Sequence, residues 1–114
     1  PLMANYYASK AYVLSFSEAM WEEARGTGVH VSCLCPGPTV SKFRERAGTD
    51  KTRLASSSKA VPSAPVARAG YNAWKRNKRV IVTGANNKFI AGVGKFLPRE
   101  TLLKLVRNLQ SPPT

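Results

Sequence analysis

Residues 29–38 read VHVSCLCPGP, a short apolar run that stops at a Pro-Gly-Pro turn. Its valines and other apolar residues predict a β-strand over residues 29–35. Because the run is nearly unbroken, it is typical of a strand covered on both faces, as in a parallel sheet. Pro36 and Gly37 end the strand abruptly.

The segments on either side of this strand predict an α/β fold. Residues 8–25 form a helix whose apolar surface is wide, so we expect its first turns to be buried on two sides. A second helix begins near Ser63, a candidate N-cap, and runs to about Lys75, before a strand over 79–83. The polar, Ser-rich residues 41–62 form a long loop or lid. Helix, strand, lid, helix and strand in this order indicate a parallel α/β sheet.

The last part of the chain predicts a helical tail. Residues 89–97 are apolar and small, and Pro98 opens a helix with a leucine-rich face and basic residues beside it. This helix either packs on the body of the protein or forms, within residues 88–110, a basic amphipathic surface for a membrane or a partner.

The composition excludes several classes of protein. The 114 residues include 18 Lys and Arg against 6 Asp and Glu, which gives a net charge of +12, and 43% are hydrophobic. That apolar share argues against disorder. No apolar run approaches the ~20 residues of a membrane span, and no signal peptide is visible. The basic residues are dispersed and match no nucleic-acid-binding motif, so nucleic acid is not an expected partner.

The two cysteines are separated by one residue on the predicted strand. Cys33 and Cys35 therefore point to the same face, and His30 is the single histidine. This set is too small for a metal site, so we expect buried, reduced thiols and a cytoplasmic location.

Tyr6 and Lys10 lie four residues apart near the start of the first helix, which places them one turn apart on the same face. A free tyrosine titrates near pH ~10, but a neighbouring ammonium favours its phenolate form. Such a pair can protonate an alkoxide or take a proton from an alcohol. Tyr71 and Lys75 have the same spacing inside the second helix, where we expect a structural role.

The context of the first pair resembles the short-chain dehydrogenase/reductase family. Tyr6, Ala8, Ser9 and Lys10 match the family motif Tyr-x-Ala-Ser-Lys, and a helix, a strand and the turn PGPTVS over residues 36–41 follow it in the family's order. The match covers residues 1 to about 43. The helix and strand within 63–84 are similar to the family's last helix and last strand.

This resemblance implies a fold and an activity. Residues 1–84 would be the C-terminal half of a Rossmann-type domain, that is, the C-terminal part of a doubly wound parallel sheet, with 43–62 as the substrate lid and 85–114 as an amphipathic helical tail. The activity would be that of an NAD(P)-dependent oxidoreductase that interconverts the carbonyl and alcohol of a small-molecule substrate. NADP is slightly preferred over NAD.

The resemblance also implies the roles of individual residues. Tyr6 would exchange the proton with the substrate oxygen, and Lys10 would hydrogen-bond the nicotinamide ribose and support Tyr6. The Pro36-Gly37 turn lies at the carboxyl end of a strand, where ligands bind in open α/β sheets. The backbone of Thr39 and the hydroxyl of Ser41 would hold the nicotinamide carboxamide. Ser41 stands where the family more often has threonine, and its hydroxyl also suits an N-cap or turn.

Other parts of the family pattern are expected before Pro1. They include the glycine-rich cofactor turn and a catalytic serine, so the chain is interpreted as a fragment that is inactive alone. Residues 80–94, VIVTGANNKFIAGVG, imitate the cofactor turn. However, Lys88 and Ile90 occupy its glycine positions, where a side chain would block the approach to a pyrophosphate.

Three further interpretations concern partners. The helix over 8–25 would pair with its copy in a homo-oligomer through Phe16, Met20 and Trp21, although simple core packing explains these residues equally well. The main alternative function is a non-catalytic basic module that binds an anionic membrane surface or nucleic acid through residues 75–107. The third is a degenerate family member retained for interaction.

Overall fold

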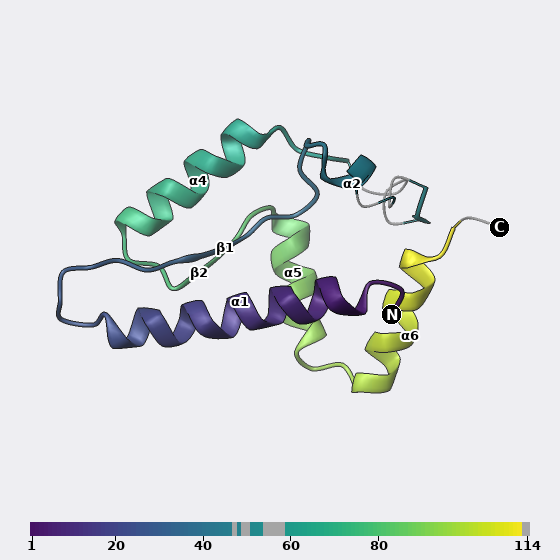
Figure 1. Ribbon diagram of the computed structural model, residues 1–114, viewed down its shortest axis with the longest axis horizontal. Helices are drawn as coiled ribbons and strands as arrows, with labels where there is room; N and C mark the ends of the chain where they lie inside the picture. Colours follow the sequence, from purple (N-terminus) through teal and green to yellow (C-terminus); the bar gives the residue numbers. More distant parts are fainter. Residues whose placement is uncertain (47, 49–50, 54–58, 113–114) are drawn as a thin grey trace.

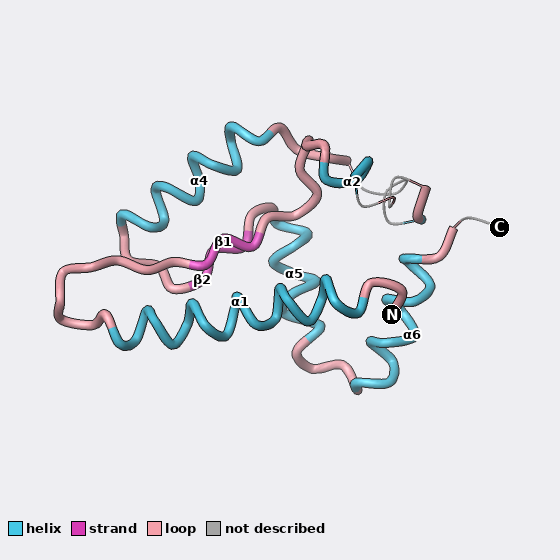
Figure 2. The backbone as a smooth tube through the Cα atoms, in the orientation of Figure 1, coloured by secondary structure: helices cyan, strands magenta, loops and turns pink. Residues whose placement is uncertain are grey.

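The computed structural model describes residues 1–46, 48, 51–53 and 59–112. The main elements follow the predicted order of helix, strand, lid, helix, strand and helical tail (Figure 2). In chain order they are α1 (Ala4–Glu23), β1 (Cys33–Cys35), α2 (Phe43–Arg46), α4 (Ser63–Lys75), β2 (Val80–Val82), α5 (Ala85–Gly94) and α6 (Arg99–Gln110). The predicted lid over 43–62 lies partly outside the described residues.

The two strands form a parallel sheet between two helices. Cys33 pairs with Val80 and Cys35 with Val82, while α1 lies on one side of the strands and α4 on the other (Figure 1). Leu34 faces α4, since a Cβ added to Gly70 of that helix would lie 3.1 Å from a Leu34 methyl. Side chains alternate along a strand, so the two cysteines face the α1 side. A helix therefore lies on each side of the strands, as predicted, but Leu34 stays 40% exposed, so the cover on the α4 side is incomplete.

Both strands are shorter than predicted. β1 does not extend over 29–35, and β2 does not extend over 79–83. The pairing starts at Cys33, whose amide donates to the carbonyl of Arg79 at 2.9 Å. Just before it, the Ser32 hydroxyl donates to the Lys78 carbonyl at 2.6 Å. At this position the Ser32 side chain, and not its backbone, bonds to the neighbouring segment. The backbone hydrogen bonds between the two strands therefore do not continue before Cys33.

The helix boundaries also correct the sequence analysis. α1 starts four residues before the predicted 8–25 and ends two residues earlier. Ser63 is not an N-cap: it is the first residue of α4, and Pro62 occupies the cap position without a side-chain hydrogen bond. Gly84 has φ 86°, a conformation that glycine adopts without steric cost. It turns the chain from β2 into α5, a helix that the sequence analysis did not separate from the tail.

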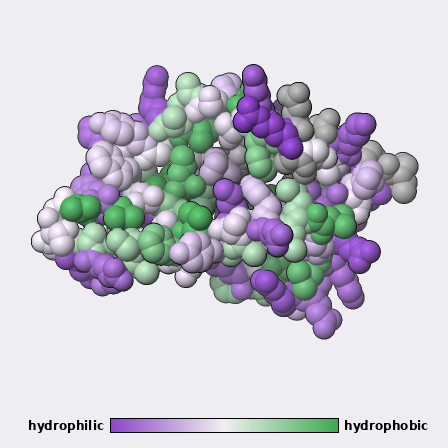
Figure 3. All heavy atoms as spheres, in the orientation of Figure 1, coloured by the Kyte–Doolittle hydropathy of each residue, from purple (hydrophilic) through white to green (hydrophobic). Residues whose placement is uncertain are grey.

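The predicted burial of α1 on two sides is wrong. None of its residues is buried, because the described residues cover only the side that faces β1. On another side the rings of Tyr12 and Phe16 stack with 5.9 Å between their centroids and remain exposed. Apolar atoms lie along α1 and between α1 and α4 on the face shown in Figure 3.

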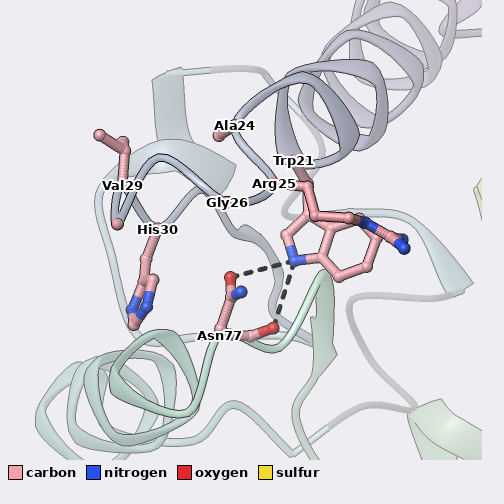
Figure 4. Close-up of a pocket in the computed structure, with 8 residues that line it drawn as sticks. Trp21, Ala24, Arg25, Gly26, Val29, His30 and Asn77 are labelled. Carbon is pink, nitrogen blue, oxygen red and sulfur yellow. Dashed lines mark hydrogen bonds between the residues drawn. The ribbon is translucent and has the colours of Figure 1, made fainter.

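A tryptophan joins the far ends of α1 and α4 (Figure 4). The indole Nε1 of Trp21 donates to both the backbone oxygen and Oδ1 of Asn77, at 3.2 and 3.1 Å. Asn77 follows α4 in a left-handed conformation, φ 51°. The guanidinium groups of Arg25 and Arg79 lie 5.3 and 5.9 Å from the indole ring centre. Trp21 thus makes contacts within its own chain.

The whole chain exposes more surface than a compact protein of its size. Its accessible surface is 8745 Å², against about 6100 Å² expected for a folded monomer of this mass. The radius of gyration is 15.5 Å, against about 13 Å expected for this length. Among the described apolar residues only Cys33 and Ala73 are buried. Within the described segments, no helix is both long and apolar enough to cross a bilayer.

Candidate active site

Tyr6 lies in the first turns of α1, in a half-buried aromatic setting. Its ring centroid is 5.3 Å from that of Phe43, the first residue of α2, and 5.7 Å from that of Tyr7. Phe43 comes two residues after Ser41. The Tyr6–Phe43 contact therefore brings the start of α1 beside the end of the turn over residues 36–41.

Lys10 lies one turn further along α1, as its spacing predicts. Its Nζ is 5.5 Å from the centre of the Tyr6 ring. The pair on α4 has the same geometry, because Nζ of Lys75 is also 5.5 Å from the Tyr71 ring. Tyr71, however, is 58% exposed and stacks on Trp74. The distance between lysine and tyrosine therefore does not distinguish the Tyr6–Lys10 pair from the Tyr71–Lys75 pair. The surroundings of the two tyrosines differ.

The turn that follows β1 is fixed by hydrogen bonds at both ends. The Thr39 hydroxyl donates to the Gly37 carbonyl at 2.9 Å, and Thr39 forms a parallel bridge with Val61. The amide of Phe43 donates to the Ser41 hydroxyl at 3.3 Å. Ser41 therefore serves as a turn residue before α2, and its predicted contact with a nicotinamide stays a prediction.

Sequence reasoning missed Asn87, which lies between the turns that follow the two strands. Its Nδ2 donates to the Thr83 carbonyl at 2.8 Å. A Cβ added to Gly37 would lie 1.8 Å from this nitrogen, and one added to Gly84 would lie 2.9 Å from it. A side chain at residue 37 would therefore have to displace the Asn87 amide, which fills the space beside it. No periodicity or motif in the sequence indicated this contact.

The segment over 80–94 does form a strand, a glycine turn and a helix, the shape that a phosphate cradle needs. Asn87 nevertheless fills the space between the two glycine turns, and Lys88 and Ile90 stand at the positions where the cradle needs glycine. That this segment is not the cofactor turn stays a prediction.

A cavity of about 230 Å³ opens at the carboxyl ends of the strands. Its walls come from three places, namely the turn after β1, one side of α4 and the start of α5. They include Pro38, Thr39, Val66, Ala69, Gly84 and Asn87. The walls are mainly apolar, and Thr39, Thr83 and Asn87 are their polar residues.

The end of α6 reaches the start of α1, next to Tyr6. Gln110 is buried, and its Nε2 donates to the phenol oxygen of Tyr7, the neighbour of Tyr6. The amide of Arg53 donates to the Ser111 carbonyl at 3.1 Å, and its guanidinium donates to Asn108. One helix end thus contacts both the start of α1 and the described part of the lid. These contacts are long-range, and nothing in the sequence indicated them.

The cysteines are separate thiols near the middle of the sheet. Their sulfurs are 4.0 Å apart, well beyond the disulfide bond length of about 2.05 Å. Burial raises the pKa of Cys35 to about 11, with smaller contributions from Cys33 and from the carboxylate of Glu18. The described residues contain no group of three or more His, Cys, Asp or Glu side chains placed to hold a metal ion.

Comparisons with known proteins agree on one family. Residues 1–52 match the family model described as short chain dehydrogenase. The chain is 32% identical over 102 residues to the ketoacyl reductase HetN of Nostoc, with 82% of this chain and 34% of that protein covered. It is 34% identical over 70 residues to nodulation protein G of Rhizobium meliloti, with coverages of 61% and 26%.

A third relative is the uncharacterized oxidoreductase YhxD of Bacillus subtilis, 21% identical over 90 residues, with 79% of this chain and 30% of that protein covered. The chain spans about a third of the length of these curated relatives, a smaller share than the predicted half. No solved structure gives a significant match. The motif around Tyr6 and Lys10, the family match and these relatives show that the chain belongs to the short-chain dehydrogenase/reductase family.

Proposed function

We propose that this chain is the C-terminal part of a Rossmann-type oxidoreductase that uses NAD(P) to interconvert a carbonyl and an alcohol. One observation carries the proposal. The half-buried Tyr6, with the Lys10 ammonium over its ring, touches Phe43 at the end of the turn that follows β1. This contact joins a proton-transfer pair to the carboxyl end of a parallel strand, where α/β sheets bind their ligands.

In the proposed reaction Tyr6 handles the proton. When the carbonyl is reduced, its phenol gives a proton to the oxygen that becomes the alcohol; in the reverse direction the phenolate accepts it. The positive charge of Lys10 stabilises the phenolate left behind. The ring contact with Phe43 restrains the direction of the Tyr6 phenol. A bound nicotinamide would supply or accept the hydride.

The residues present suit the nicotinamide end of the cofactor. Thr39 and the turn at Pro36-Gly37 line the cavity or border it, and Lys10 has no carboxylate partner among the described residues. Thr39 and Ser41 would hold the carboxamide, and Lys10 the ribose. The described residues contain no cradle for the phosphates, which would come from a further part of the protein. In this proposal NADP is slightly preferred over NAD, and the substrate is a small molecule with a carbonyl or alcohol group. The protein would act in the cytoplasm.

The test uses the protein encoded by the full reading frame and the same reading frame cut to these 114 residues. We expect carbonyl-dependent oxidation of NADPH or NADH by the longer protein and no turnover by the shorter one. Tyr6→Phe should lower kcat of the longer protein about 10²-fold or more.

The second Tyr–Lys pair supplies a matched control. Tyr71→Phe removes the same hydroxyl from a pair of identical ring-to-ammonium distance, and its activity should stay within about twofold of the unchanged protein, as for a surface substitution. Robust turnover by the 114-residue chain would contradict the fragment interpretation. Equal losses in the two variants, or no loss in either, would remove Tyr6 from the mechanism.

A further inference from the structure

The segment formed by α5 and the turn after it exposes large apolar side chains. Phe89 is 72% exposed, Ile90 67% and Phe96 89%, and no residue of α5 is buried. Figure 1 shows α5 leading away from the strands, with the turn to α6 at the margin of the molecule. Soluble proteins seldom leave such a cluster in water unless it contacts a partner or a membrane.

The apolar side of α6 is partly covered, in contrast to that of α5, although Leu103 and Leu105 stay 43% and 49% exposed. Leu102, Val106 and Leu109 are half-buried, and Gln110 at the helix end is buried against Tyr7. The amphipathic surface predicted over 88–110 is therefore concentrated at its first part. We define the α5 surface as Phe89, Ile90, Val93 and Phe96 together with Lys88, Lys95 and Arg99.

Basic residues lie within and after α5 in the sequence. Within residues 85–112 the cations are Lys88, Lys95, Arg99, Lys104 and Arg107, and Glu100 is the single acid. In the described part of the chain none of these five cations pairs with a carboxylate. Exposed phenyl rings beside unpaired cations suit the surface of an anionic bilayer. The rings would enter the boundary of the acyl chains, and the cations would contact the anionic headgroups.

We propose that the α5 surface attaches the protein to an anionic lipid bilayer. A second copy of the chain is the weaker occupant, because it would bring a surface of the same positive sign against this one. The attachment does not rest on the proposed reaction: it needs only the exposure and charge of this segment.

The test measures sedimentation of the protein with vesicles of phosphatidylcholine, with and without phosphatidylserine. We expect binding to the phosphatidylserine vesicles, weakened by salt. Phe89→Ser with Phe96→Ser, and separately Lys88→Glu with Lys95→Glu, should each lower the partition coefficient at least about tenfold. Circular dichroism checks that each variant keeps its helical content.

Two controls match these changes elsewhere on the chain. Tyr71→Ser removes an exposed ring from α4, and Lys75→Glu with Arg76→Glu reverses two charges at the end of the same helix; both should bind within about twofold of the unchanged protein. In a Phe96→Trp variant, brominated lipids should quench the added fluorescence. The proposal would be overturned if the protein did not bind the vesicles, or if the control variants lost binding as strongly as the α5 variants. It would also be overturned if the α5 variants changed only the oligomeric mass, measured by light scattering, and not the binding to vesicles.

Discussion

At the scale of single residues, two properties depend on the immediate surroundings of one side chain. Asn87 fills the space beside Gly37, and burial changes the acidity of Cys35. Each leads to a substitution whose effect can be separated from that of a matched variant. Neither feature is visible as a motif.

Gly37→Ala should destabilise the protein by about 1–3 kcal/mol, the usual cost of forcing a carbon into filled space. The added Cβ would displace the Asn87 amide and break its hydrogen bond to Thr83. Gly92→Ala, in a helix with nothing within 4 Å of the new carbon, should instead stabilise by about 0.5–1 kcal/mol. Urea unfolding measures both. In an Asn87→Ala background the cost of Gly37→Ala should largely vanish, and an unchanged cost there would contradict this account.

The raised pKa of Cys35 predicts a loss of stability at alkaline pH. In the folded chain the thiol keeps its proton up to about pH 11, whereas in the unfolded chain it ionises near pH ~8.5. The stability that the protonated Cys35 thiol contributes is fully present below the pKa of the unfolded chain. It is lost as the pH rises toward the pKa of the folded chain. Urea unfolding at several alkaline pH values should therefore show a steeper decline for the unchanged protein than for Cys35→Ala. Parallel declines would refute the assignment.

At the scale of elements, the layers are joined by few contacts. Trp21 links the end of α1 to the turn after α4, and the contact between Tyr6 and Phe43 links the start of α1 to α2. Between these two points α1 meets β1 on one side, and Glu18 pairs with Arg79 at 3.1 Å. The position of α1 therefore depends on contacts near its ends.

Trp21→Phe should lower the free energy of unfolding by about 1–2 kcal/mol, because it removes a donor that Asn77 uses twice. Tyr12→Phe, which removes an exposed hydroxyl on the same helix, should have little effect. Urea unfolding followed by circular dichroism compares the two. A loss of equal size in both variants would show that the indole contact is not what joins the helices.

Much of the element order was accessible from the sequence, and the long-range contacts were not. Continuous apolar residues around Cys33 correctly indicated a strand between two helices, although Leu34 stays exposed. The Tyr6–Lys10 spacing correctly placed the two side chains one turn apart. The two-sided burial of α1 was wrong because an apolar residue count does not say which surfaces have a partner. Asn87 and Gln110 act across sequence distances that no local pattern encodes.

At the scale of the whole molecule, the excess exposed surface leaves apolar faces open to assembly. Tyr12 and Phe16 form a stacked, exposed pair on α1, and we propose that α1 joins a second copy of the protein through this pair. Met20 is half-buried, and Trp21 is held by Asn77 within its own chain. Of Phe16, Met20 and Trp21, which the sequence suggested as contacts between copies, Phe16 is therefore the main candidate that remains.

Phe16→Glu should shift the protein toward monomer, because it places a charge in the proposed contact between copies. Tyr71→Glu, which changes an exposed aromatic residue on α4, should leave the assembly unchanged. Multi-angle light scattering measures the mass of each variant. A monomeric unchanged protein, or an equal effect of the two substitutions, would contradict assembly through α1.

The hydrogen bond from Gln110 to Tyr7 has a practical consequence for anyone who handles this protein. It places the last helical turn one side chain away from Tyr6, although 103 positions separate the two bonded residues. A purification tag or a truncation immediately after α6 therefore acts next to the phenol that we propose transfers the proton. Activity lost on tagging at that end would report a disturbed neighbour and not a missing catalyst.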